Sequence, residues 1–202
     1  MTKSQTATLK KQSFILPGVK HAQKYQQGRL DGLCGVYAII NAIEVLTATK
    51  GPRRAVEPRD VMRAGVSHLV ARKMLEEVIN SGMTVFSQYR LTRAVIRTLR
   101  DDRGVSIKVN RPLANHWDAK RNRLFKCLDK SLEQGLPVII CLGNTLRHFS
   151  VIVGKTPSRY VLHDSACLKW ISRDAIGMAS GSDTHRHLIE PKSVIVVSLQ
   201  ES

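Results

Sequence analysis

The sequence predicts an α+β fold in which a helix near the N-terminus packs on an antiparallel sheet formed by the C-terminal half. Residues 35–48, GVYAIINAIEVLTA, have the periodicity of a helix that is apolar on most sides, and such a helix belongs in the middle of a domain. Asn41 and Glu44 interrupt it, either to satisfy buried main-chain groups or to mark its solvent edge. After residue 135 the chain carries short β-rich runs separated by turns: LPVIICLG, HFSVIVG, RYVLHDS and SVIVVSL.

The residues between these two patterns are predicted to be mainly helical. Hydrophobic spacing indicates three further helices, over residues 59–80, 88–101 and 117–134. Gly135 suits the end of the last one, and VSIKV, residues 105–109, is a candidate strand. Residues 1–25 are predicted to be a polar lead-in, and residues 1–202 together fit one domain with its own core.

The composition indicates a globular protein with free thiols. Apolar residues make up 43% of the chain, and no apolar run approaches the ~20 residues that span a bilayer. The N-terminal residues lack the apolar stretch of a secretory signal, which predicts a cytoplasmic protein, or one delivered to another cell by a route without such a signal. The absence of a C-x-x-C pair among the four cysteines argues against a zinc site, and no cofactor is predicted.

Two other groups of residues are weaker candidates for chemistry. Cys127 and Cys141 lie in apolar patterns that are typical of core positions. THRH, residues 184–187, holds two histidines, which is weak support for a metal site without further ligands. An exposed loop is the simpler interpretation of that segment, so no metal is predicted.

The positive charge of the chain is unusual. It carries 32 Lys and Arg against 16 Asp and Glu, a formal net charge of +16, which favours an anionic partner or surface and says nothing about the fold. Four arginines in the region of residues 90–126 follow helical spacing, on another face from Leu91, Val95 and Leu99: Arg90, Arg93, Arg97 and Arg100. They form either a patch for phosphates or an acidic protein, or a solvated helix face. The lack of a nucleic-acid signature or aromatic-stacking motif in the sequence favours the solvated face.

Cys34 lies in DGLCGVYAIINA, residues 31–42, at the point where the apolar helix is predicted to begin. A helix N-terminus or a neighbouring imidazolium favours the thiolate form of a cysteine, which makes it a nucleophile. Gly35 permits the close approach of backbone or substrate, and Asp31 is well placed to cap the turn. A thiolate nucleophile also needs a general base, and the base needs an orienting group. The alternative is that Cys34 is a small buried core residue.

The second half of the chain offers both partners. His148 opens the run HFSVIVG, Asp164 ends the run RYVLHDS, and the turn GKTPSR separates them. If the two runs pair as a hairpin, the opening of one strand lies opposite the end of the next, so His148 and Asp164 become neighbours at one sheet edge. His163 should point the opposite way from Asp164. Cys167 is close enough in sequence to lie near this site without acting in it.

Together, DGLCGVYAIINA, HFSVIVG and LHDS resemble the papain-like cysteine peptidase superfamily, and in particular its compact bacterial members that cleave double-glycine leader peptides. The resemblance implies a papain-like fold, with Cys34 as nucleophile, His148 as base and acid, and Asp164 as orienting group. It also implies a glutamine before the cysteine that helps to form the oxyanion hole. Gln27, seven residues before Cys34 and slightly further than usual, is the best match, and Gln26 is the reserve.

The predicted function is therefore the cleavage of a peptide or amide bond by a Cys–His–Asp triad, with a protein or peptide as substrate. Glutamine deamidation and acyl transfer use the same machinery, so an effector or toxin with one of these activities is the first alternative. The second alternative is a non-catalytic basic module on the same fold that binds an anionic partner.

Overall fold

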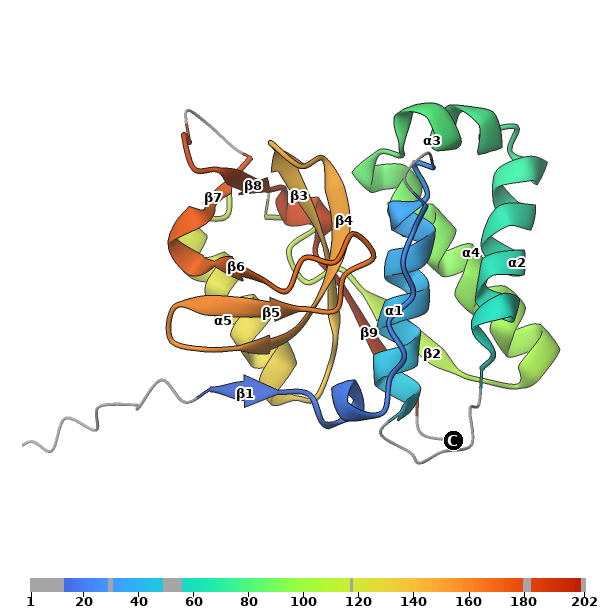
Figure 1. Ribbon diagram of the computed structural model, residues 1–202, viewed down its shortest axis with the longest axis horizontal. Helices are drawn as coiled ribbons and strands as arrows, with labels where there is room; N and C mark the ends of the chain where they lie inside the picture. The colour runs from blue at the N-terminus through green and yellow to red at the C-terminus, as the bar shows by residue number, and fades with distance from the viewer. Residues whose placement is uncertain (1–12, 29–30, 49–55, 117, 180–182, 201–202) are drawn as a thin grey trace, which may run out of the picture.

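The computed structural model describes residues 13–28, 31–48, 56–116, 118–179 and 183–200, and it shows a mixed α+β fold (Figure 1). The described residues form five α-helices and nine strands. The first twelve residues of the predicted lead-in lie outside them. No helix in the described part of the chain is both long and apolar enough to cross a bilayer.

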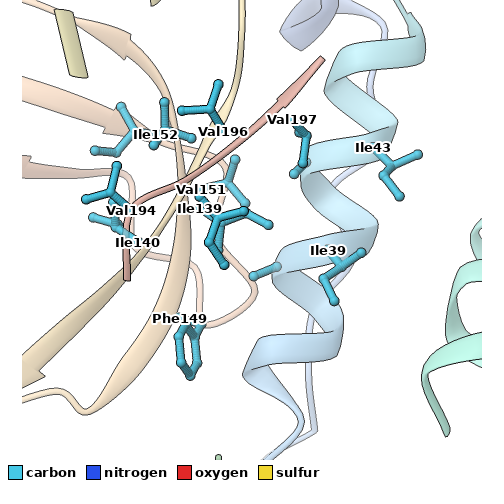
Figure 2. Close-up of a cluster of buried hydrophobic side chains, with 14 of the residues drawn as sticks. Ile39, Ile43, Ile139, Ile140, Phe149, Val151, Ile152, Val194, Val196 and Val197 are labelled. Atoms are coloured by element: carbon cyan, nitrogen blue, oxygen red, sulfur yellow. The ribbon is translucent and has the colours of Figure 1, made fainter. Parts of the chain in front are cut away.

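The helix α1 (Cys34–Ala48) is the central element, as the sequence predicts, and 13 of its 15 residues are buried. On one side it packs against the sheet, where Ile139, Val151 and Val197 lie on the face of the strands turned toward it (Figure 2). On the other side α2 (Pro58–Ala71) and α4 (Val85–Arg103) cover it (Figure 1). These two layers explain why α1 is apolar on most sides.

The prediction of one continuous helix over residues 59–80 is wrong, because the structure divides this segment into α2 and α3 (Leu75–Ser81). Lys73, between them, has φ of 56°, a left-handed conformation that an α-helix cannot continue through. The helix predicted over residues 88–101 is longer than expected, because the Thr84 hydroxyl accepts a hydrogen bond from the Ser87 N–H at 3.1 Å and so caps an earlier start. At its end, Gly104 adopts φ of 67°.

The predicted strands all form, and together with β6 (Trp170–Ser172), which was not predicted, they lie in one mostly antiparallel sheet with the order β2-β9-β3-β4-β5-β6. Their bounds are β2 (Ile107–Asn110), β3 (Val138–Asn144), β4 (His148–Lys155), β5 (Arg159–Leu162) and β9 (Ile195–Leu199). The helix α5 (Arg121–Glu133) falls within the predicted range 117–134, of which residue 117 is outside the described residues. It packs on β3 and β4, and Gly135 after it has φ of 78°.

Four further strands have no counterpart among the predicted elements: β1 (Phe14–Ile15), β6 (Trp170–Ser172), β7 (Ile176–Met178) and β8 (His187–Ile189). Each has two or three residues, which is too short to show a periodic pattern. Short 3₁₀ turns complete the described chain: η1 (Pro17–Lys20), η2 (Arg173–Ala175) and η3 (Pro191–Ser193). The strand β8 pairs with β3 and, in parallel, with β7.

Residues 23–25 run along α1 and are held by the polar side chains that interrupt its apolar surface. The fully buried Asn41 accepts a hydrogen bond from the N–H of Tyr25 at 2.8 Å and donates its Nδ2 to the Tyr25 carbonyl at 3.0 Å. Glu44 accepts one from the Gln23 N–H at 3.3 Å. Of the two interpretations of Asn41 and Glu44, the satisfaction of buried main-chain groups is therefore confirmed.

Asn41→Ala should lower the free energy of unfolding by about 2–3 kcal/mol, because two hydrogen bonds are lost at a buried position. Asn122→Ala, at an exposed position of α5, is the matched control and should change that free energy by less than about 0.5 kcal/mol. Urea denaturation followed by circular dichroism measures both variants. Equal stability of the two would show that the Asn41 amide does not hold residues 23–25 in place.

Candidate active site

Hydrogen bonds to a single carboxylate shape the turn before Cys34. Asp31 accepts one from the N–H of Leu33 at 3.1 Å through Oδ1 and one from the N–H of Gly28 at 2.7 Å through Oδ2. The expected role of Asp31 in this turn is therefore confirmed. Cys34 follows as the first residue of α1, where its side chain is 6% exposed.

Two glycines beside Cys34 let α3 and α4 approach this turn closely. A Cβ atom on Gly32 would collide with the carbonyl oxygen of Val78 in α3, and one on Gly35 would collide with Oε1 of Gln88. Gln88 reaches across from α4, is fully buried, and donates its Nε2 to the Gly35 carbonyl at 2.9 Å. The close approach expected at Gly35 is thus made by Gln88, a residue that no sequence motif indicated.

The β4–β5 hairpin brings His148 and Asp164 together. Its antiparallel register pairs Ile152 with Leu162, so that Asp164 lies level with Ser150, two residues along β4 from His148. Alternation along the strands then directs both side chains to the same side of the pair. His148 Nε2 lies 2.7 Å from Asp164 Oδ2, and both side chains are buried. The proximity predicted from the spacing of the two runs is confirmed.

The electrostatic environment favours the charged forms of both groups. Burial alone would lower the pKa of His148, but its hydrogen bond to Asp164 and its interaction with the Cys34 thiol outweigh burial and raise that pKa to about 9. Burial likewise opposes ionisation of Asp164, yet the hydrogen bond from His148 lowers the pKa of that carboxyl. The N–H groups of Ala166 and Leu168 also donate to its Oδ1, at 2.8 and 3.1 Å. At neutral pH an imidazolium therefore lies between a carboxylate and the thiol.

Gln27 lies beside the loop that follows β5. Its N–H donates to the Ser165 carbonyl at 3.2 Å, and its Oε1 accepts a hydrogen bond from the Ser165 hydroxyl at 3.3 Å. Because Ser165 directly follows Asp164, Gln27 approaches the site from the Asp164 side, with the Nε2 end of its amide left to donate. Within the described residues no hydrogen bond joins Gln27 to Cys34, and Gln26 is exposed.

The other three thiols differ from Cys34 in their surroundings. Cys141 and Cys127 pack against the core, as predicted. Burial, with a contribution from nearby Cys34, raises the pKa of Cys141 to about 12, and burial also raises the pKa of Cys127. Cys167 is exposed in the loop after Asp164. Burial therefore keeps Cys127 and Cys141 in the protonated form, which is a poor nucleophile.

The remaining histidines near these strands take structural positions. His163 donates its Nε2–H to the Gln23 carbonyl at 3.2 Å, which directs it away from Asp164 as strand alternation predicts, and burial lowers its pKa. The prediction of an exposed loop over residues 184–187 is wrong for His187. This residue is buried and is the first of β8, because it pairs with Asn144 of β3. In the described part of the chain no group of three or more His, Cys, Asp or Glu residues is arranged to hold a metal.

The His148 imidazole should titrate with a pKa near 9. Asp164→Asn should lower that pKa, because the carboxylate charge is removed while the burial that opposes protonation remains. NMR titration of the imidazole signals measures this, and His187, whose pKa is lowered by burial and by Arg186, serves as an internal control that should not move. A pKa that stays near 9 in the Asn variant would mean that Asp164 is not what holds the proton on His148.

Comparisons with known proteins add no family to this description. No protein-family model matches the chain, and no curated protein matches it. The site is thus described by its own groups: a thiol at the first residue of a buried helix, an imidazolium, and a buried carboxylate that fixes the imidazolium. Such a set can activate a thiol for attack on an electrophilic carbon.

Proposed function

We propose that the chain is a papain-like thiol hydrolase that cleaves a peptide or amide bond. Cys34 is the nucleophile, His148 the general base and acid, and Asp164 the group that orients His148. The observation that carries this proposal is the 2.7 Å hydrogen bond between His148 and a buried Asp164, with the thiol of Cys34 as the other neighbour of the imidazole. The packing of α1 on an antiparallel sheet and the chain order Cys, His, Asp support it.

The proposed reaction begins from the Cys34 thiolate, which an adjacent imidazolium favours. Sulfur attacks the substrate carbonyl carbon, and the π electrons move onto the oxygen. The oxyanion then collapses and expels the amine, which takes its proton from His148 and leaves a thioester on Cys34. A water molecule that gives its proton to the now neutral His148 attacks the thioester carbon, the C–S bond breaks, and the acid leaves while the Cys34 thiolate and the His148 imidazolium are restored. Asp164 holds the imidazole in one orientation and stabilises its charged form at both stages.

The start of α1 is the proposed binding site for the oxyanion. The first N–H groups of an α-helix have no partner within the helix and point toward its N-terminus, where they favour negative charge. The amide of Gln27 is the proposed second donor, and each such donor stabilises the transition state by about 3 kcal/mol. Because Oε1 of Gln27 accepts the hydrogen bond from Ser165, Nε2 is the end of the Gln27 amide that can donate to the oxyanion. This supports the assignment.

Incubation of the purified protein with a cell lysate tests the reaction type. Mass spectrometry should find new peptide N-termini with the wild type and none with Cys34→Ala or His148→Ala, because either change removes the thiolate chemistry. Cys127→Ala, which removes a half-buried thiol on α5, is the control and should behave as wild type. If Glu appears at Gln positions of the lysate proteins without new N-termini, the reaction is deamidation rather than hydrolysis of the main chain. If neither change appears, the proposal is overturned in favour of a binding module.

Gln27→Ala should slow the chemical step by roughly 10²-fold if its amide binds the oxyanion, with little change in KM. Gln26→Ala is the matched control, because it changes the neighbouring glutamine, which is exposed. Steady-state kinetics on a peptide identified in the lysate experiment measures both. If Gln27→Ala retained full activity while Gln26→Ala lost it, the oxyanion role would belong to Gln26.

A further inference from the structure

A cationic groove lies on the outer face of the helical layer, apart from the proposed hydrolytic site. It is a cavity of about 510 Å³ on α2 and α4, which pack side by side. Four arginines line it: Arg72, Arg90, Arg93 and Arg97. No carboxylate occurs among the described residues that line it, and the carboxylates of Asp60 and Asp102 line an adjoining hollow.

The positive surface continues along α4 beyond this cavity. A second hollow, of about 320 Å³, shares Arg93 and Arg97 with the first and adds Arg100, which is paired with Asp101 at 3.2 Å. All four arginines of the predicted row are exposed, and the apolar face of the same helix is buried as predicted. From Arg90 to Arg100 the row covers about 15 Å of helix. The two hollows therefore adjoin at Arg93 and Arg97.

Two aromatic rings lie in the same groove. Phe86 is 58% exposed, with the Arg90 guanidinium 4.7 Å from its ring centre. The Tyr89 ring has the Arg111 guanidinium at 3.7 Å and that of Arg93 at 5.8 Å. Each ring precedes an arginine of the row by four residues, which places ring and arginine together on one helix face. The sequence showed no aromatic-stacking motif beside the arginines. The structure corrects that interpretation, because it places the rings of Phe86 and Tyr89 next to arginine side chains.

We propose that this groove binds single-stranded nucleic acid, with the arginines on the phosphates and the rings of Phe86 and Tyr89 beneath unpaired bases. Cationic grooves with aromatic rings suit single strands, because unpaired bases offer faces that stack on rings and on guanidinium planes, whereas a duplex hides them. An acidic protein would satisfy the arginines but would not account for the exposed Phe86 ring. The net charge of +16 favours association with a polyanion.

The groove and the proposed hydrolytic site contact opposite faces of α4. Gln88 points inward, where it is buried and bonded to Gly35 beside Cys34, while Phe86 and Arg90 are exposed on the outside. Changes to the groove should therefore leave thiol chemistry intact. The proposal is thus independent of the hydrolase proposal, and each can fail without the other.

Fluorescence anisotropy of a labelled oligothymidylate of about 15 nucleotides tests the proposal with the full chain. Arg93→Glu with Arg97→Glu should weaken binding by about tenfold or more and reduce the slope of log K against log salt by about 1.4, since each phosphate contact on a single strand contributes about 0.7. Lys126→Glu with Lys130→Glu is the matched control, an equal change of charge at exposed positions of α5. Equal losses in the two double variants, or no salt-sensitive binding by the wild type, would overturn the proposal.

A single variant separates nucleic acid from an acidic protein. Phe86→Ala should weaken oligothymidylate binding about fivefold or more, because stacking on one ring contributes at least about 1 kcal/mol, and it should not change the binding of polyglutamate of equal charge. The ring is exposed, so its removal should leave the fold intact. If polyglutamate binds as tightly as oligothymidylate and Phe86→Ala affects neither, the groove recognises acidic proteins and the proposal is wrong.

His68 provides a readout of where the nucleic acid binds. It lines the groove, where burial and the charges of Arg72 and Arg90 lower its pKa. Bound phosphates offset that repulsion, so NMR titration with saturating oligothymidylate should show a raised pKa for His68. His187 in β8, whose pKa is lowered by burial and by Arg186 just before the strand, is the control and should not move. An unchanged His68 would place the ligand outside this groove and overturn the proposal.

Discussion

Every layer of the structure depends on the burial of α1. A helix that is apolar on most sides is stable in water only when other elements cover each of those sides. The sheet covers one side and α2 with α4 another, while residues 23–25 lie along a third and are bonded to Asn41 and Glu44. Because α1 is enclosed in this way, its first residue is held where the helical layer and the sheet meet. The position of Cys34 is therefore a result of core packing.

The candidate site is a junction between the two halves of the chain, and its charges stabilise one another. A carboxylate as buried as Asp164 is costly without a partner, and the imidazolium of His148 is equally costly without the carboxylate. Their hydrogen bond satisfies both and leaves the second ring nitrogen for the thiol. The helical half contributes the Cys34 sulfur and the proposed oxyanion site at the start of α1, and the sheet half contributes His148 and Asp164. Neither half contains the proposed chemistry by itself.

The elements that could be predicted from the sequence are those whose own residues determine them. The central helix follows from its composition, and the meeting of His148 with Asp164 follows from strand length and turn length. The break at Lys73 could not be predicted, because good helix formers surround it and no glycine or proline marks it. The contact of Gln88 with Gly35 and the gathering of Phe86 with the arginines of α4 and with Arg72, just after α2, depend on how distant helices pack. No local pattern carries that information.

The place of β9 in the sheet has a consequence for how the protein is made. The strands β3, β4, β5 and β6 are consecutive in the chain and adjacent in the sheet, so they can pair as soon as they leave the ribosome. β9 follows all of them but lies between β2 and β3, with Ile195 opposite Ile139 and Leu199 opposite Ile107. Until residues 195–199 emerge, one edge of β3 and part of the apolar surface of α1 stay uncovered. A nascent chain stalled before that point would expose an unpaired strand edge and apolar surface, which are the features that chaperones bind.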